Sequence, residues 1–184
     1  MRAILALVSI VPLLVACADE GKQIADATVT GGGKKGAELV AYPEGYGQKF
    51  MRSASVDRTN PKQIAELFVN DVGAKGMKTS GGLPSGTVLV MEVHNAKLDA
   101  QEKPILENGR RVKNGLGFVA VMEKRTGWGA EYPADLRNGE WEYAAFDPTT
   151  KQLRSTDTKA CFECHLKSAK PGQDFVFSFE KLPR

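Results

Sequence analysis

The chain has 184 residues, with 25 lysines and arginines, 22 aspartates and glutamates, and a formal net charge of +3. This length is enough for one domain with a substantial core and short for two domains. The basic residues are scattered along the sequence rather than gathered in a stripe, which argues against nucleic-acid binding.

The first residues have the pattern of an export signal. An apolar run at residues 4–16 has the length of a signal-peptide core and is too short to span a bilayer. Leu14 lies three residues before Cys17 with a small residue between them, as in bacterial lipoprotein signals, where Cys17 would be lipidated. The alternative is simple cleavage after Ala18, which would release a soluble product.

We therefore divide the chain into three parts. Residues 1–17 are the predicted lipoprotein-like signal peptide, residues 18–36 a flexible linker rich in glycine, and residues 37–184 the folded domain. We expect a periplasmic bacterial protein, anchored to the envelope membrane if Cys17 carries a lipid.

The folded domain shows short strand patterns separated by turns. Alternating or β-branched stretches predict strands at residues 50–56, 87–93, 117–123, 141–146 and 174–179. The stretch at 64–69 fits a strand or a short helix, and residues 70–78 favour a short helix. Residues 96–112 are expected to form an exposed hairpin or loop, and residues 158–167 a helical turn. The pattern predicts a mainly β, α+β fold of five or so antiparallel strands with short helices.

The clearest strand pattern also assigns two faces. Alternation along residues 87–93 places Thr87, Leu89, Met91 and Val93 on one face, and Val88, Val90 and Glu92 on the other. His94 is expected to end this strand at the surface.

Cys161-Phe162-Glu163-Cys164-His165 is the pattern of c-type haem attachment. On one helical turn, Cys161 and Cys164 face the same way, so both sulfurs can form thioether bonds to one porphyrin. His165 would then be the proximal ligand of the iron. We expect its other ring nitrogen to donate to a carbonyl or a carboxylate. The motif predicts one covalently bound haem c.

The two cysteines also suggest three other kinds of site. A structural zinc site usually needs four protein ligands, and the chain offers only His94 and Cys17 in addition. A thioredoxin-like redox pair is expected near the start of a domain, whereas these cysteines lie near the end of the chain. A disulfide between Cys161 and Cys164 stays open as an alternative.

Further patterns accompany the haem motif: Tyr42-Pro43-x-x-Tyr46, Leu67-Phe68-Val69-Asn70, Gly86-Thr87-Val88-x-Val90-x-Glu92, Trp141 and Asp174-x-Val176-Phe177. Together with that motif, they resemble the cytochrome P-460 and cytochrome c′-beta family. The resemblance implies a mostly antiparallel β fold, a homodimer, and a histidine-ligated iron whose distal side is usually open. Members of that family oxidise hydroxylamine or nitric oxide, or bind gases reversibly.

The resemblance also indicates residues at the distal face. In the hydroxylamine-oxidising branch a lysine is cross-linked to the porphyrin, and its position here is Met91. A distal carboxylate of that branch corresponds to Met122, or to Glu123 if the alignment slips by one residue. With Met91 and Met122 as the distal-face candidates, the pocket lacks the cross-link and the proton acceptor.

Three functions remain open. The preferred prediction is a haem with an apolar distal face that binds nitric oxide or carbon monoxide. The second is a His/Met electron carrier with a periplasmic electron-transfer partner, in which Met91 or Met122 ligates the iron. The third is an oxidoreductase for hydroxylamine or nitric oxide, with Glu123 as the candidate catalytic residue. Ligation by His94 is the least favoured arrangement.

Overall fold

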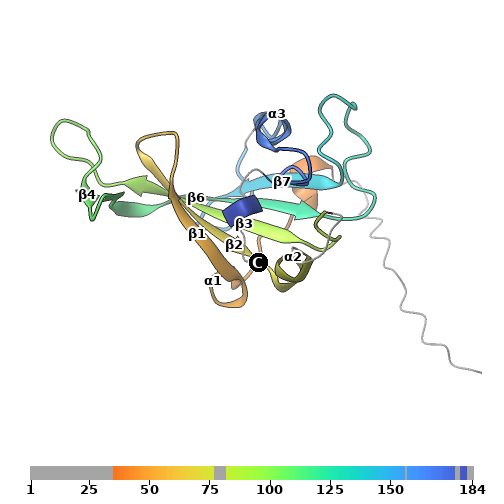
Figure 1. The fold of residues 1–184 in the computed structure, drawn as a ribbon, viewed down its shortest axis with the longest axis horizontal. Helices are drawn as coiled ribbons and strands as arrows, with labels where there is room; N and C mark the ends of the chain where they lie inside the picture. Colours follow the sequence, from red (N-terminus) through yellow and green to blue (C-terminus); the bar gives the residue numbers. More distant parts are fainter. Residues whose placement is uncertain (1–34, 77–81, 156, 177–178, 182–184) are drawn as a thin grey trace, which may run out of the picture. The chain divides into compact units, whose positions relative to one another are not determined.

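Five antiparallel strands form one sheet, and the other elements are arranged around it (Figure 1). In pairing order the strands are β1 (Met51–Asp57), β2 (Gln63–Val69), β3 (Val88–Ala96), β6 (Lys113–Lys124) and β7 (Trp141–Phe146). All four pairings are antiparallel, and strands that follow one another along the chain within this sheet are neighbours in it. The predicted mainly β, α+β fold is therefore confirmed, and the 64–69 stretch is a strand.

This computed structural model describes residues 35–76, 82–155, 157–176 and 179–181. The predicted signal peptide, Cys17 and nearly all of the predicted linker lie outside these residues. Contacts within the chain separate residues 1–30 from residues 31–184, and every described residue belongs to the second unit. No helix within the described ranges is long and apolar enough to cross a membrane.

Short helices complete the body of the fold. They are η1 (Gly36–Leu39), α1 (Tyr46–Lys49), α2 (Asp71–Gly76), α3 (Lys159–Ser168) and η2 (Phe179–Lys181). The helices predicted near residues 70–78 and 158–167 are thus present as α2 and α3.

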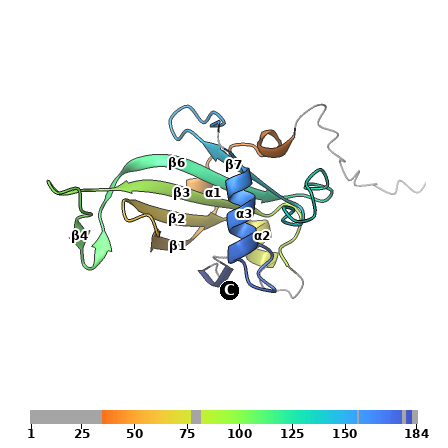
Figure 2. The ribbon, with the colours of Figure 1, turned by 90° about the horizontal axis from the view of Figure 1, so that it is seen from above.

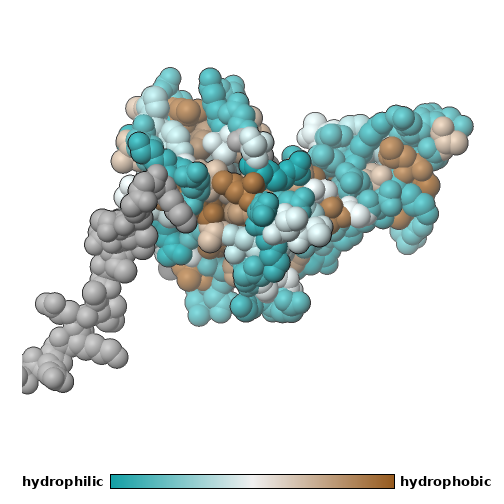
Figure 3. All heavy atoms as spheres, turned by 180° about the vertical axis from the view of Figure 1, so that it is seen from behind, coloured by the Kyte–Doolittle hydropathy of each residue, from teal (hydrophilic) through white to brown (hydrophobic). Residues whose placement is uncertain are grey.

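A small hairpin projects from one end of the sheet (Figure 1). It consists of β4 (Leu106–Glu107) and β5 (Arg110–Arg111), joined by a turn in which Asn108 and Gly109 both have positive φ. Apolar side chains are visible on this arm in the space-filling view (Figure 3), and its Leu106 is 59% exposed. The predicted exposed hairpin at residues 96–112 is confirmed.

The alternation of side chains gives the main sheet two different faces. Leu89 and Met122 lie opposite each other on β3 and β6, in a core cluster that includes Phe162 of α3. Val90 and Val121, one position along each strand, belong to a second cluster that contains no residue of α3. We call these the α3 face and the opposite face.

The segment that precedes β1 covers part of the opposite face. The ring of Tyr42 meets Phe146 of β7 edge-on, with centroids 5.5 Å apart, and Tyr46 meets Phe68 of β2 at 5.4 Å. Val40 is buried in the same cluster. Such edge-to-face aromatic pairs add to the stabilisation that burial provides. The opposite face thus has a core of its own.

The strand predicted at residues 174–179 is wrong for the residues described there. Asp174 and Phe175 lie in a turn with φ angles of 47° and 61°, and the chain continues after the undescribed residues 177–178 as the 3-10 helix η2. The aromatic alternation suits a strand, but the Asp174 carboxylate binds groups elsewhere in the fold and keeps this segment in a turn.

Candidate haem site

Helix α3 lies across the strands on the α3 face (Figure 2). Phe162, which is 1% exposed, anchors it, with ring centroids 4.4 Å from Tyr132 and 4.7 Å from Tyr143 of β7. The buried Asn138 donates from Nδ2 to the Phe162 carbonyl at 3.1 Å and to the Tyr143 hydroxyl at 2.9 Å. These contacts fix the helix that carries the predicted haem motif.

The two cysteines of the motif are free thiols in the same helix, three residues apart. Cys161 is half-buried against the core cluster of the α3 face, whereas Cys164 is exposed. Burial, followed by the proximity of Cys164, raises the pKa of the Cys161 thiol. Both side chains are therefore available on one helical surface, as two thioether bonds to one porphyrin require.

His165 is oriented by a hydrogen bond from its ring. Its Nδ1 lies 2.7 Å from the carbonyl oxygen of Phe175, and a carbonyl only accepts, so Nδ1 carries a proton. Burial lowers the pKa of His165 and outweighs the Phe175 bond, which raises it. The neutral ring with Nδ1 protonated presents Nε2 as the nitrogen that could coordinate iron. Of the two kinds of partner expected, a carbonyl or a carboxylate, the structure shows a carbonyl, that of Phe175.

The aromatic ring of Tyr143 also lies against this histidine. Its centroid is 4.8 Å from that of the His165 imidazole, at an interplanar angle of 46°. Because Asn138 donates to the Tyr143 hydroxyl, this ring is itself held in place. Cys161, Cys164 and His165 therefore fit a covalently attached, histidine-ligated haem.

Met91 and Met122 both lie on the α3 face. Met91 of β3 is paired with Leu67 and Ala120, and it is partly exposed. Met122 of β6 is 8% exposed and packs in the same core cluster as Phe162. The fold brings both methionines to the side of the sheet on which the haem motif lies.

The glutamates of the main sheet all lie on the opposite face. Glu66 and Glu92 are cross-strand partners on β2 and β3, and Glu123 and Glu142 are cross-strand partners on β6 and β7. Along each strand, the residues on either side of the glutamate lie on the α3 face. Glu123 is buried there and bound to Arg125 at 2.6 Å. The structure therefore does not bring Glu123 to the haem motif.

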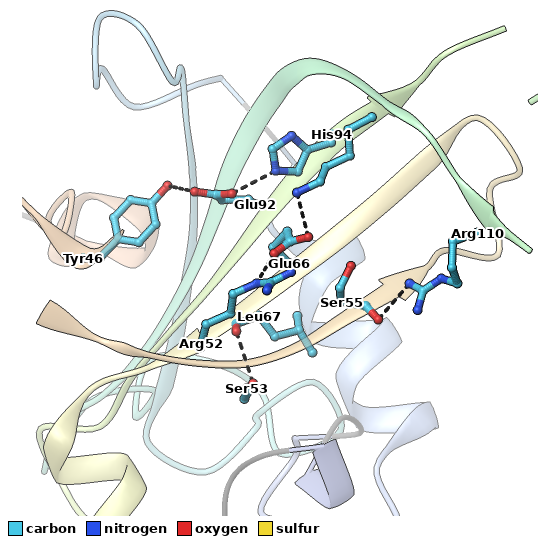
Figure 4. A network of polar contacts seen from close by, with 10 residues as sticks. Tyr46, Arg52, Ser53, Ser55, Glu66, Leu67, Glu92, His94 and Arg110 are labelled. Atoms are coloured by element: carbon cyan, nitrogen blue, oxygen red, sulfur yellow. Dashed lines mark hydrogen bonds and ion pairs between the residues drawn. The ribbon is translucent and has the colours of Figure 1, made fainter. Parts of the chain in front are cut away.

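Glu66 is the centre of a polar network on the opposite face (Figure 4). It is 3% exposed and is bound by Arg52 and, at 2.8 Å, by Lys113. Burial alone would raise the pKa of Glu66, but the bonds from Arg52 and Lys113 outweigh it and hold the pKa at about 2. This carboxylate is thus ionised and neutralised locally.

Glu92 extends this network and holds His94. Its two oxygens bind the Tyr46 hydroxyl and the His94 Nε2, each at 2.8 Å (Figure 4). His94 was expected to end its strand at the surface, but β3 continues to Ala96 and the His94 side chain is 13% exposed. The glutamate on the same strand face draws the imidazole inward. His94 therefore lies on the opposite face, away from the haem motif.

Arg58 lies near the motif, although no local sequence pattern indicates this. Burial lowers the pKa of its guanidinium, and an electrostatic interaction with Cys164 of the motif acts in the opposite direction. Its Nη1 donates to Gln63 at 2.8 Å. An arginine just after a strand looks like an ordinary surface charge, so only the folding of the β1–β2 turn reveals this position.

The described residues contain no group of side chains that would support a zinc site. Among those residues, no three His, Cys, Asp or Glu side chains are arranged to hold a metal ion.

The site thus consists of a helix on an antiparallel sheet. The helix carries two thiols on one surface and a histidine oriented by a hydrogen bond. These features are those of a haem-binding protein. The family model named Cytochrome P460 matches residues 43–178, and the chain belongs to this family. Membership implies a haem cofactor. No curated protein matches the chain.

Proposed function

We propose that this protein is an exported monohaem c-type cytochrome that binds small gases such as nitric oxide or carbon monoxide. Cys161 and Cys164 would hold the haem through thioether bonds, and His165 would be the proximal ligand of the iron. The bound haem would supply an iron centre with affinity for small diatomic ligands.

The observation that carries this proposal is that no glutamate of the main sheet lies on the α3 face. All four glutamates of the main sheet lie on the opposite face, whereas the α3 face offers apolar residues such as Leu67, Met91 and Ala120. Oxidation of hydroxylamine requires a group that accepts protons near the substrate. An apolar face suits the binding of a neutral gas instead.

Covalent attachment is tested on protein produced together with the cytochrome c maturation machinery. The pyridine haemochrome spectrum of the denatured protein should be that of a haem with two thioether bonds. Haem that extracts into acidified organic solvent would refute attachment through Cys161 and Cys164.

Gas binding is tested on the reduced holoprotein. We expect a high-spin ferrous spectrum that shifts at once when carbon monoxide is added, and the same behaviour in the matched variants Met91→Leu and Met122→Leu. Turnover of hydroxylamine with an electron acceptor, lost in Glu123→Gln, would contradict the proposal and favour an oxidoreductase.

A His/Met electron carrier is the second candidate, because both methionines lie on the α3 face and Met91 is partly exposed. In that case the reduced protein is low-spin and binds carbon monoxide slowly or not at all. One of the two leucine variants would then become high-spin and bind the gas rapidly, which would identify the ligating methionine.

The proposal extends to location and assembly. Haem attachment of this kind takes place outside the cytoplasm, and the pattern around Cys17 supports a lipid anchor. Mass spectrometry of the mature N-terminus tests lipidation, and an unmodified chain that begins at Asp19 would refute it. The family resemblance supports a homodimer, for which light scattering on the purified protein should give twice the mass of one chain.

A further inference from the structure

The turn that follows α3 holds two consecutive residues in the left-handed region of the backbone. Asp174 has a φ of 47° and Phe175 a φ of 61°. Residues with a Cβ adopt this conformation at a cost in free energy, and phenylalanine has no polar side-chain atom that would offset it. Such strain persists only where neighbouring groups enforce it. The contacts of this turn must therefore hold it in place.

The Asp174 carboxylate supplies these contacts from two directions. Its Oδ2 accepts hydrogen bonds from the backbone N–H of Leu83 at 2.8 Å and from Nζ of Lys124 at 2.9 Å. Asp174 and Lys124 are 14% and 15% exposed, so their ion pair is largely shielded from water. Gly82 permits this close approach, because a Cβ there would lie 3.3 Å from the carboxylate. The turn is thus tied to two distant segments.

The same turn presents the Phe175 carbonyl to His165 at 2.7 Å from Nδ1. We propose that Asp174, together with Lys124, is a positioning residue for the proximal histidine, because it holds the strained turn in which this carbonyl accepts the imidazole proton. This inference rests on the proposed function, in which His165 ligates the haem iron.

The position of the carbonyl affects the iron through the imidazole. A short Nδ1–H···O bond gives the ring more anionic character, which strengthens its bond to iron and favours the ferric state. Loss of the ion pair would let the turn relax and weaken this bond. The Fe–His bond would then weaken, and the midpoint potential would rise.

The test compares Asp174→Asn and Lys124→Met with wild type and with Glu180→Gln, all as holoproteins. Glu180 is an exposed carboxylate of the same C-terminal segment, and its ion pair, to Lys170 at 3.9 Å, involves neither Asp174 nor Phe175. We expect unchanged haem content by pyridine haemochrome. The Fe–His stretching frequency in resonance Raman spectra of the ferrous protein should fall in both test variants, and the midpoint potential should rise in both. Asp174→Glu should restore both values toward wild type.

The two test variants separate positioning from a simple effect of charge. Removal of an anion raises the potential of a nearby haem, whereas removal of a cation lowers it. The proposal would be overturned if the midpoint potentials of Asp174→Asn and Lys124→Met shifted in opposite directions while the Fe–His frequency stayed unchanged. It would also be overturned if Glu180→Gln changed the frequency and the potential as much as the test variants do. If the wild-type protein contained no covalent haem, the proposed function itself would be refuted. The haem content measured by pyridine haemochrome distinguishes this outcome from failure of the positioning proposal.

Discussion

At the scale of single residues, Glu142 is a carboxyl group of the sheet whose pKa is raised by burial. It is fully buried on β7, where its Oε2 accepts a bond from the Tyr132 hydroxyl at 3.0 Å and its Oε1 has no hydrogen-bond partner among the described residues. Burial raises the pKa of Glu142 to about 7, against the Tyr132 bond, which lowers it. The group is therefore neutral in mildly acidic solution and costly when ionised.

Glu142→Gln should remove a pH dependence of stability. The folded pKa lies above the unfolded value of 4.5, so the contribution of wild-type Glu142 is fully present below pH 4.5 and is lost as the pH rises through 7. Glutamine keeps an acceptor for Tyr132 without the charge. At pH 8 we expect the variant to be more stable than wild type by about 2 to 3 kcal/mol, and at pH 5 nearly equal.

Urea unfolding at the two pH values measures this difference. Glu107→Gln, at an exposed position on β4, serves as the control and should follow wild type. Parallel stability profiles of wild type and Glu142→Gln across pH 5 to 8 would show that Glu142 titrates normally.

At the scale of elements, α3 depends on one aromatic anchor. Phe162 is 1% exposed between Tyr132 and Tyr143, whereas Leu166, one turn later, is only partly buried. Phe162→Ala should lower the free energy of unfolding by about 3 to 5 kcal/mol, because it leaves a cavity between helix and sheet. Leu166→Ala should cost clearly less, and equal losses in urea unfolding would contradict this account of the anchor.

The β1–β2 turn depends on an arginine of the β4–β5 arm. Nη1 of Arg111 donates to the carbonyls of Arg58 at 2.9 Å, Asn60 at 3.0 Å and Gln63 at 2.9 Å. Arg111→Lys cannot reproduce this geometry and should destabilise the turn by about 1 to 2 kcal/mol.

Hydrogen exchange tests this prediction. The amide of Gln63, which donates to the Asn60 carbonyl inside the turn, should exchange faster in Arg111→Lys. Arg110→Lys is the matched control, because Arg110 donates to Ser55 within β1 and not to the turn. Similar exchange at Gln63 in both variants would show that Arg111 is dispensable there.

At the scale of the whole molecule, the two faces of the sheet have separate cores. The cluster on the opposite face includes Tyr46, Phe68 and Val90 and no residue of α3. A variant with Cys161→Ala and Cys164→Ala cannot form thioether bonds, but it retains that core. We expect its far-UV circular dichroism to keep the signal of the sheet, with faster hydrogen exchange confined to α3. A general loss of β signal would mean that the sheet requires attached haem.

Most elements could be predicted because their signals are local. The alternation at residues 87–93 and 117–123, the compact pattern at 141–146 and the short helix around the haem motif all appear in the structure. The strand predicted at residues 174–179 was wrong because the bonds of Asp174 to Leu83 and Lys124 are formed only between distant parts of the chain.

The sequence by itself determined the haem motif, the alternation of each strand and the mainly β class, because spacing and period depend only on neighbouring residues. The tertiary structure alone decided which residues meet. The register between strands placed the four glutamates on one face, because a slip of one residue would have turned the side chains of a strand to the other face. Folding of the last turn likewise brought the Phe175 carbonyl to His165, a pairing that no local pattern encodes.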